Sequence, residues 1–392
     1  MSAPSDVCFA QITDLHVGND GLNPREAEAN LRWVLEELAA LPRCVLCLVV
    51  TADLVCCGKR EELAEYRRLL DRPHLPVYAL PANHDLWGEA DACAWEELIG
   101  PRRQVVELGG LRIILWDDSE RRPGQSSAWR AHASQEKLEW LAAELATEQP
   151  TIVAHHIPTL PIGDDFHDQW SGSNAAEVLD LFRERHVLAT ITGHWHRNGE
   201  WPARGVRVIN TGALCGWQWT GTPPHYCFPT RPGYRLFHFD GTLRTLWREG
   251  SYWQTPAPGV QVALEWIGPA HTGGPRPQVH PVEVAGRCRL RATAYSTGEA
   301  VERVEWSLVH RDWRQMVRTY HGLWSEWEAE LDPKECRAAG ELICCVRCRT
   351  KGNQEAYDQV PVRIAPRDSS PKTDASARAC AETLFEMHYA PE

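Results

Sequence analysis

The sequence predicts a layered α/β domain followed by a smaller, antiparallel β-sandwich. Up to about residue 250, short apolar runs alternate with segments that have the period of an amphipathic helix, which indicates an α/β sheet protein. A proline-rich stretch follows at residues 255–259, and beyond it apolar residues recur at every second position. Several short strands of this kind, with turn residues between them, are typical of a β-sandwich, which we expect to be Ig-like.

The length of the chain also favours two domains, because 392 residues exceed what one ordinary hydrophobic core holds. We expect the first domain over residues 1–255 and the sandwich over residues 256–366. Residues 367–392 are rich in Ser, Pro, Lys and Asp and are expected to form a flexible tail.

The elements of the first domain follow from their apolar patterns. Apolar runs of strand length occur at residues 7–12, 44–50, 77–80, 151–154, 187–192 and 206–210. Helical spacing of apolar residues occurs at 24–41, 59–71 and 134–147. Ser134 stands at the N-cap position of the last of these helices. Gly109 and Gly110 predict a hairpin between strands at 104–108 and 111–116.

The strands of the second domain are recognised by their alternation. In the first of them, Cys288, Leu290, Ala292 and Ala294 fall on one face. The same pattern returns at residues 304–308, 327–331, 342–348 and 360–364. These five strands predict one apolar face each, and hence a core between two sheets.

Composition and charge narrow the class of function. A hydrophobic content of 43% and a charged content of 24% are those of a globular protein. The net charge of -12 argues against binding to nucleic acid or to an anionic membrane. We see neither a membrane-spanning run nor a secretory signal, and most of the 14 cysteines lie in apolar runs. We therefore expect a cytoplasmic protein with reduced cysteines.

Residue types that bind metals follow five strands of the first domain. They are Asp14 and His16, then Asp53, Asn83, the pair His155 and His156, and finally His194 and His196. Sheets of α/β proteins carry their ligand sites at such strand ends, and residues i and i+2 there point the same way. Carboxylate, imidazole and amide oxygen together suit divalent Mn, Fe, Zn, Co or Ni, and Asp53 is the candidate to bridge two ions. Each motif alone is common in loops, so the prediction depends on their order and spacing.

In this order the motifs resemble those of the calcineurin-like metallophosphoesterases. "DLH", "ADLVCCG", "ANHD", "HHIP" and "GHWH" stand where that family has DxH, GDxxxxG, GNH(D/E), a later histidine at a strand end, and GHxH. The likeness spans roughly residues 7–212. It implies an α/β/β/α sandwich, two divalent metal ions, and hydrolysis of a phosphoester by in-line attack of a hydroxide that bridges the two ions.

The resemblance also implies a role for each residue. One ion would be held by Asp14, His16, Asp53 and His196, and the other by Asp53, Asn83, His194 and one of His155 or His156. The family's H-x-P pattern favours His156, whereas counting from the strand favours His155, so both remain candidates. His84 is expected to be a proton donor or a phosphate clamp. Asp85 is expected to orient the His84 ring, with a helix N-cap as its alternative role.

Two positions depart from the family pattern, because Ala52 and Ala82 stand where the family has glycine. Alanine at a positive φ costs about 1 kcal/mol or more. A positive φ at either position would therefore strain the site, whereas a negative φ would make the alanine harmless.

The substrate class is indicated by further comparison of the motifs. Cys56 stands where the iron-tyrosinate acid phosphatases of the superfamily carry tyrosine, and the GDxxDRG motif of phosphoprotein phosphatases is absent. The chain looks more like the bacterial cyclic-nucleotide and glycerophosphodiester phosphodiesterases. We expect a small phosphoester substrate, with a diester ahead of a monoester. The alternatives are a phosphomonoesterase, such as a nucleotidase, and an inactive metal-binding scaffold. The sandwich is a possible site of homo-oligomer formation.

Overall fold

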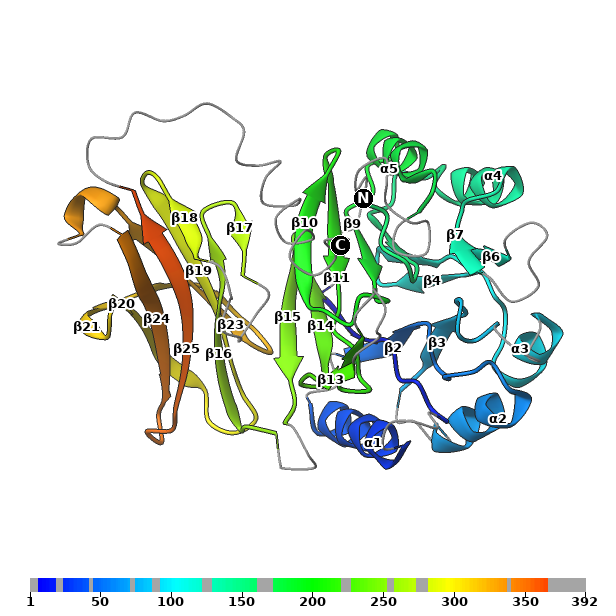
Figure 1. The fold of residues 1–392 in the computed structure, drawn as a ribbon, viewed down its shortest axis with the longest axis horizontal. Helices are drawn as coiled ribbons and strands as arrows, with labels where there is room; N and C mark the ends of the chain where they lie inside the picture. Colours follow the sequence, from blue (N-terminus) through cyan, green and yellow to red (C-terminus); the bar gives the residue numbers. More distant parts are fainter. Residues whose placement is uncertain are drawn as a thin grey trace, which may run out of the picture. The chain divides into compact units, whose positions relative to one another are not determined.

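The structure is a computed structural model that describes residues 6–18, 24–41, 45–70, 75–86, 92–121, 129–160, 172–219, 227–251, 257–272, 281–336 and 340–365. These residues fall into two compact units that divide between Pro256 and Ala257 (Figure 1). The tail predicted over 367–392 lies outside the described residues. Within the described ranges, no helix is both long enough and apolar enough to cross a membrane.

Two mixed sheets form the centre of the first unit. The first has the strand order β15 (Leu243–Glu249), β14 (Gly233–Phe239), β1 (Val7–Ile12), β2 (Val45–Thr51) and β3 (Val77–Leu80). The second has the order β10 (Gly199–Ala203), β11 (Val206–Asn210), β9 (Ala189–Thr192), β8 (Thr151–Ala154), β5 (Leu111–Leu115) and β4 (Gln104–Leu108). Strands β1, β2 and β3 are parallel, as are β5, β8, β9 and β11. Their carboxyl ends therefore meet at one edge of each sheet.

The two sheets pack face to face around a shared apolar core. Phe9 of β1 and Phe237 of β14 stack with ring centroids 4.6 Å apart. The same core includes Ile113 of β5 and Ile152 of β8 from the second sheet. Ile114, the next residue along β5, points to the other face and packs in a separate core with the helices. Both faces of these strands are buried, which explains why their apolar runs are continuous.

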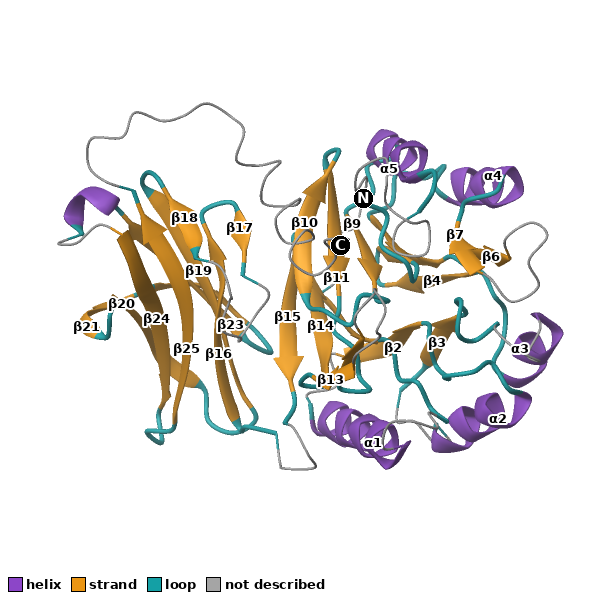
Figure 2. Ribbon diagram, viewed as in Figure 1, coloured by secondary structure: helices purple, strands orange, loops and turns teal. Residues whose placement is uncertain are grey.

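Helices cover the outer faces of this pair of sheets (Figure 2). They are α1 (Pro24–Ala40), α2 (Arg60–Leu69), α3 (Ala92–Leu98), α4 (Gln135–Glu144) and α5 (Ala175–Glu184). Leu141 of α4 and Phe182 of α5 pack against the second sheet, while α1 lies against the first. The α/β/β/α arrangement predicted for this part of the chain is confirmed. Two short hairpins complete the unit, β6 (Ser119–Arg121) with β7 (Trp129–Ala131) and β12 (Trp217–Trp219) with β13 (Cys227–Pro229).

The loop between β2 and α2 is fixed by the first turn of the helix. The Glu62 carboxylate accepts hydrogen bonds from the backbone N–H groups of Lys59 at 3.2 Å and Cys57 at 3.0 Å. This is the contact that a glutamate at the third helical position makes in a capping box. These hydrogen bonds fix the end of the loop that begins at Asp53.

The second unit is a β-sandwich of two five-stranded sheets. One has the order β17 (Ala270–His271), β16 (Val260–Ile267), β19 (Cys288–Ser296), β23 (Ser325–Leu331) and β22 (Val317–His321). The other has the order β18 (Val282–Val284), β25 (Glu355–Ile364), β24 (Gly340–Thr350), β20 (Val301–Leu308) and β21 (Arg311–Gln315), with a short 3-10 helix at Pro333–Glu335. The alternating residues meet in one core, as with Leu290, Val346 and Val362. One pair departs from the prediction, because β18 runs parallel to β25.

A largely buried carboxylate joins α1 to the first sheet of the first unit. Glu37 accepts hydrogen bonds from Arg248 Nε at 2.7 Å, from the Tyr234 hydroxyl at 3.0 Å and from Trp33 Nε1 at 2.8 Å. Burial alone would raise the pKa of Glu37, but the hydrogen bonds and charge of Arg248 outweigh it and lower the pKa. The ionised form of Glu37 therefore stabilises the folded state.

Glu37→Gln should lower the free energy of unfolding by about 3 kcal/mol at pH 7, because the buried Arg248 would lose its counter-charge. A carboxyl group whose pKa is lowered by folding stabilises the protein above its unfolded pKa of about 4.3, and this stabilisation is lost as the pH falls through the folded value. The difference between variant and wild type should thus shrink below about pH 4. Urea denaturation at several pH values measures it, with the exposed neighbour Glu36→Gln as control. A difference that does not vary with pH would contradict the assignment to charge.

Candidate metal centre

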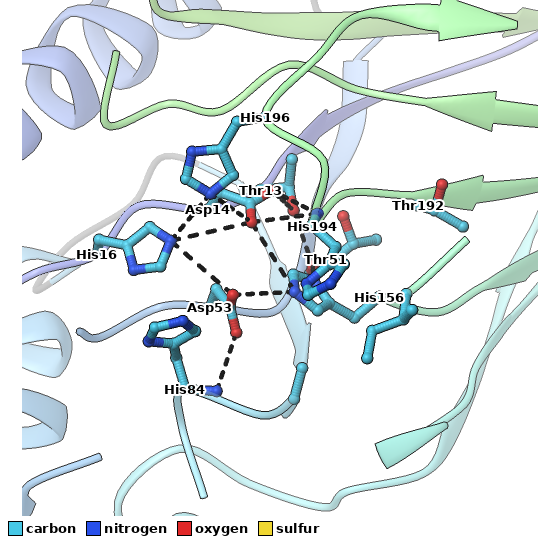
Figure 3. A network of polar contacts seen from close by, with 12 residues as sticks. Thr13, Asp14, His16, Thr51, Asp53, His84, His156, Thr192, His194 and His196 are labelled. Carbon is cyan, nitrogen blue, oxygen red and sulfur yellow. Dashed lines mark hydrogen bonds and ion pairs between the residues drawn. The ribbon is translucent and has the colours of Figure 1, made fainter. Parts of the chain in front are cut away.

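The loops after β1, β2, β8 and β9 bring Asp14, Asp53, His156 and His194 close together where the two sheets end (Figure 3). Backbone hydrogen bonds tie these loops to one another. The N–H of Asp14 donates to the carbonyl oxygen of Ala52 at 3.1 Å. The N–H of His16 donates to the carbonyl oxygen of Asp53, also at 3.1 Å. On the other sheet, the N–H of Gly193 donates to the carbonyl oxygen of His156 at 3.0 Å. The predicted strand-end residues are thus held next to one another.

These loops turn sharply, and six of their residues have a left-handed backbone. The φ values are 52° at Asp14, 51° at His16, 68° at Ala52, 47° at Asp53, 68° at His194 and 51° at His196. Such conformations are uncommon outside glycine, and they are found where the surrounding structure compels them, often at functional sites. Their concentration here sets this edge apart as a site.

The two alanines that replace the family's glycines behave differently. Ala52 has a positive φ of 68°, whereas Ala82 does not fall in that region. The left-handed conformation costs Ala52 about 1–2 kcal/mol, and burial of its methyl group between the sheets offsets about 0.8 kcal/mol of this. Asp53, the next residue, still lies within reach of the histidines described below.

Three side chains make up what we call the first cluster: Asp14, His16 and Asp53, whose ligand atoms all lie within 4.8 Å of one another. His16 Nε2 lies 4.0 Å from Asp14 Oδ1 and 3.8 Å from Asp53 Oδ2. His196 joins this cluster, because its Nε2 lies 3.2 Å from Asp14 Oδ1 and 3.1 Å from His16 Nε2.

The second cluster shares Asp53 with the first. It consists of Asp53, His156 and His194, again with ligand atoms within 4.8 Å of one another, and His156 Nε2 lies 3.0 Å from Asp53 Oδ2. Asn83 follows the end of β3, and the backbone N–H of its neighbour His84 donates to Asp53 Oδ1 at 3.2 Å. Among the described residues, none donates a hydrogen bond to the buried Asn83 Oδ1. A buried acceptor of this kind fits a cation ligand.

Backbone carbonyls set the tautomers of two of the histidines. His156 Nδ1 donates to the Thr51 carbonyl oxygen at 2.8 Å, which leaves Nε2 facing Asp53. His196 Nδ1 donates to the carbonyl oxygen of Trp217, which leaves Nε2 facing Asp14. Metal-binding histidines are oriented in this way, with one nitrogen held by a hydrogen bond and the other directed at the ion.

Asp14 is fixed by the loop that carries the last two histidines. The backbone N–H of His194 donates to both carboxylate oxygens of Asp14, at 3.1 and 3.0 Å. Gly193 must be glycine for this approach, because a Cβ there would lie 1.9 Å from Thr13 Oγ1 and 2.5 Å from Asp14 Oδ2. The glycine of the GHWH motif therefore lets the loop pack directly on the carboxylate.

The charges at the site are balanced between carboxylates and imidazoles. Burial would raise the pKa of Asp14, but the charges of His196 and His156 outweigh it and lower the pKa to about 2. Burial would lower the pKa of His156, but Asp53 and Asp14 raise it to about 10. The ionised carboxylates thus stabilise positive charge in this buried space, and a bound divalent cation would supply that charge.

Residues 9–198 match the family model described as calcineurin-like phosphoesterase. This part of the chain is a calcineurin-like phosphoesterase domain. It contains both clusters and every strand end from which they come.

Relatives of the phosphoesterase domain include bacterial enzymes. The chain is 26% identical over 250 residues to a protein of Pseudomonas aeruginosa named 3',5'-cyclic adenosine monophosphate phosphodiesterase, covering 62% of this chain and 89% of the relative. It is 28% identical over 163 residues to a glycerophosphodiester phosphodiesterase of Enterobacter lignolyticus, covering 38% of this chain and 55% of the relative. Among solved structures, a putative 5'-nucleotidase from Staphylococcus aureus aligns with a TM-score of 0.40 at 13% identity, covering 62% of this chain and 53% of the other.

Of the two candidate histidines after β8, the phosphoesterase domain brings only His156 to Asp53. The Nδ1 of His155 lies 3.0 Å from Asp118 Oδ2, and its ring lies 5.7 Å from that of Trp116 in the layer beneath α5. Asp118 also accepts a hydrogen bond from the N–H of Ile157 at 2.9 Å. It thereby holds the loop that presents His156. Asp118 was not predicted from the sequence, although it follows β5 closely and the rule for strand ends applies to it.

The predicted contact between Asp85 and the His84 ring was wrong. Both oxygens of Asp85 accept backbone N–H groups instead, from Asp53 at 2.9 Å, Leu54 at 2.8 Å, Val55 at 3.2 Å and Ala82 at 3.0 Å. The His84 ring is oriented by the carbonyl oxygen of Cys56, which accepts from Nδ1 at 2.6 Å. Asp85 is therefore a positioning residue that fixes the turn around Asp53, rather than a catalytic one or a helix N-cap.

Proposed function

We propose that the chain is a phosphoester hydrolase with two divalent metal ions, and that it prefers diesters. The observation that carries this proposal is the sharing of Asp53 by two clusters of cation ligands. A carboxylate between two ions is what a binuclear phosphoesterase requires. The names of the bacterial relatives, phosphodiesterases of cyclic nucleotides and glycerophosphodiesters, support a small diester substrate.

The donor atoms fit two cations. We assign one ion to Asp14, His16, Asp53 and His196, and the other to Asp53, Asn83, His156 and His194. The oriented Nε2 atoms, the paired carboxylates and the buried Asn83 Oδ1 all support this assignment. Mixed nitrogen and oxygen ligands suit Mn, Fe, Zn, Co or Ni.

The chemistry divides between the ions and the side chains around them. Bound cations would activate a water molecule as the nucleophile and neutralise charge on the phosphoryl group. The His84 ring lies next to that of His16, with ring centroids 4.7 Å apart, and its Nδ1–H is held by the carbonyl oxygen of Cys56. Its Nε2 can then carry a proton only in the imidazolium form, which would donate that proton to the leaving oxygen or hold a phosphate oxygen.

We place this activity in a catalytic domain over residues 1–255 of a cytoplasmic enzyme, and we treat residues 256–366 as a separate domain. Every residue assigned to the two ions lies in the first of these ranges. The free cysteines among the described residues support a reducing compartment.

Metal analysis together with a substrate panel tests the proposed function. We expect about two ions per chain and faster turnover of bis-p-nitrophenyl phosphate than of p-nitrophenyl phosphate. Because folding raises the pKa of His156 to about 10, metal loading at pH 7 should release protons, and apparent affinity should fall as the pH is lowered. Faster turnover of the monoester would favour a phosphomonoesterase. Two bound ions with no turnover of either ester would favour the inactive scaffold. The strain at Ala52 would then be its structural explanation.

A further inference from the structure

A thiol lies beside the first cluster, on the loop that follows β2. The Sγ of Cys56 and one ring nitrogen each of His16 and His84 all lie within 4.8 Å of one another. His16 belongs to this trio and to the first cluster as well. A soft sulfur donor therefore lies within 4.8 Å of a ring nitrogen of His16, a residue of the first cluster.

The backbone on both sides of this thiol is held in place. The N–H of Cys56 donates to the carbonyl oxygen of Val17 at 3.0 Å, next to an isolated parallel bridge between Val17 and Val55. The carbonyl oxygen of Cys56 accepts from His84 Nδ1 at 2.6 Å. Since the Cα is fixed relative to the site, rotation about a single side-chain bond decides where the sulfur points.

A second thiol, that of Cys215, has its Sγ within 4.8 Å of ring nitrogens of His16 and His196, but it contacts different atoms. Its Sγ lies 3.8 Å from His196 Nδ1, the nitrogen that faces the Trp217 carbonyl oxygen, and 3.8 Å from that oxygen. The other nitrogen of the ring, Nε2, faces Asp14. Cys215 thus contacts the side of the His196 ring away from the carboxylates, so we consider Cys56 as the sulfur ligand and Cys215 as its alternative.

We propose that the Cys56 thiol is an additional ligand of the ion in the first cluster, and that it makes this position select a thiophilic ion such as Zn²⁺ over Mn²⁺. The inference rests on the proposed binuclear centre. On coordination the thiol would give up its proton to solvent and bind as the thiolate. Sulfur ligands favour zinc, whereas carboxylate and water ligands suit manganese.

The thiol differs from the other donors near it in its softness, because Asp14 and Asp53 offer oxygen and His16 offers nitrogen. An ion that is not thiophilic gains little from a sulfur ligand, and this difference in affinity is the basis of the expected selection.

Reconstitution with Co²⁺ tests the proposal, because the absorption spectrum shows both whether the ion is bound and whether sulfur is among its ligands. Protein-bound cobalt has ligand-field bands in the visible, and a thiolate ligand adds a sulfur-to-cobalt charge-transfer band in the near ultraviolet. We expect both in the wild type. Cys56→Ser should keep the visible bands and lose the charge-transfer band, and its affinity for Zn²⁺ relative to Mn²⁺ should fall by about tenfold or more. Cys57→Ser, the adjacent thiol, is the matched control and should keep both signals.

Each other outcome has a defined meaning. Visible bands without a charge-transfer band in the wild type would overturn the proposal, as would a charge-transfer band that survives in Cys56→Ser. Loss of that band in Cys215→Ser, with Cys56→Ser unaffected, would overturn it in favour of the other thiol. The absence of cobalt bands after dialysis of the wild type would overturn the metal centre itself, so that failure is distinct from the failure of this inference.

Discussion

Asp53→Asn should reduce phosphodiester turnover by about a thousandfold or more and deplete both ions, because the carboxylate of Asp53 is common to both clusters. The amide has the same shape and retains one oxygen, which can still accept the hydrogen bond from the N–H of His84. Asparagine also tolerates the positive φ of 47° at this position. The variant should therefore fold, so that its defect reports the lost charge and bridge.

Metal content after dialysis and initial rates with bis-p-nitrophenyl phosphate measure this effect. Asp180→Asn is the matched control, because Asp180 lies on α5 and pairs with Arg204 at 2.7 Å, away from both clusters. It should leave metal content and turnover unchanged. A variant of Asp53 that keeps two ions and more than about a tenth of the wild-type rate would exclude a bridging role for this carboxylate.

The strand-end residues could be predicted because their placement depends only on local pattern and on general properties of sheets. Asp14 and Asp53 follow short apolar runs that are typical of buried strands, and parallel neighbours bring their carboxyl ends together. The alternation along the later strands likewise predicted a sandwich core, which residues such as Leu290 and Val346 form. In both cases the elements are encoded in short stretches of sequence, and the metal site is predicted from the order of those stretches along the chain.

Other features of the site depend on contacts between distant segments. The His155 ring contacts Asp118, which follows a different strand, so only His156 faces Asp53. The role of Asp85 depends on the backbone N–H groups that surround it, and no pattern of side chains encodes those. The positive φ of Ala52 is likewise imposed by tertiary packing, since alanine by itself disfavours it. The residue types at the strand ends are therefore easier to predict from the sequence than the contacts that orient them.

His84→Ala should lower turnover of a diester with an alcohol leaving group by about a hundredfold or more, while both ions remain bound. His84 lies outside the two clusters that share Asp53, and its ring is held by the carbonyl oxygen of Cys56. A proton donor matters most when the leaving oxygen is strongly basic. The loss should therefore be much smaller for bis-p-nitrophenyl phosphate, whose leaving group needs no proton.

The leaving-group dependence separates the two roles assigned to His84. A phosphate clamp would give equal losses with both esters, because it contacts an oxygen that does not leave. Loss of an ion from the variant would contradict both roles and make His84 a ligand. His186→Asn, a change of an exposed histidine just after α5, is the control and should alter neither rate.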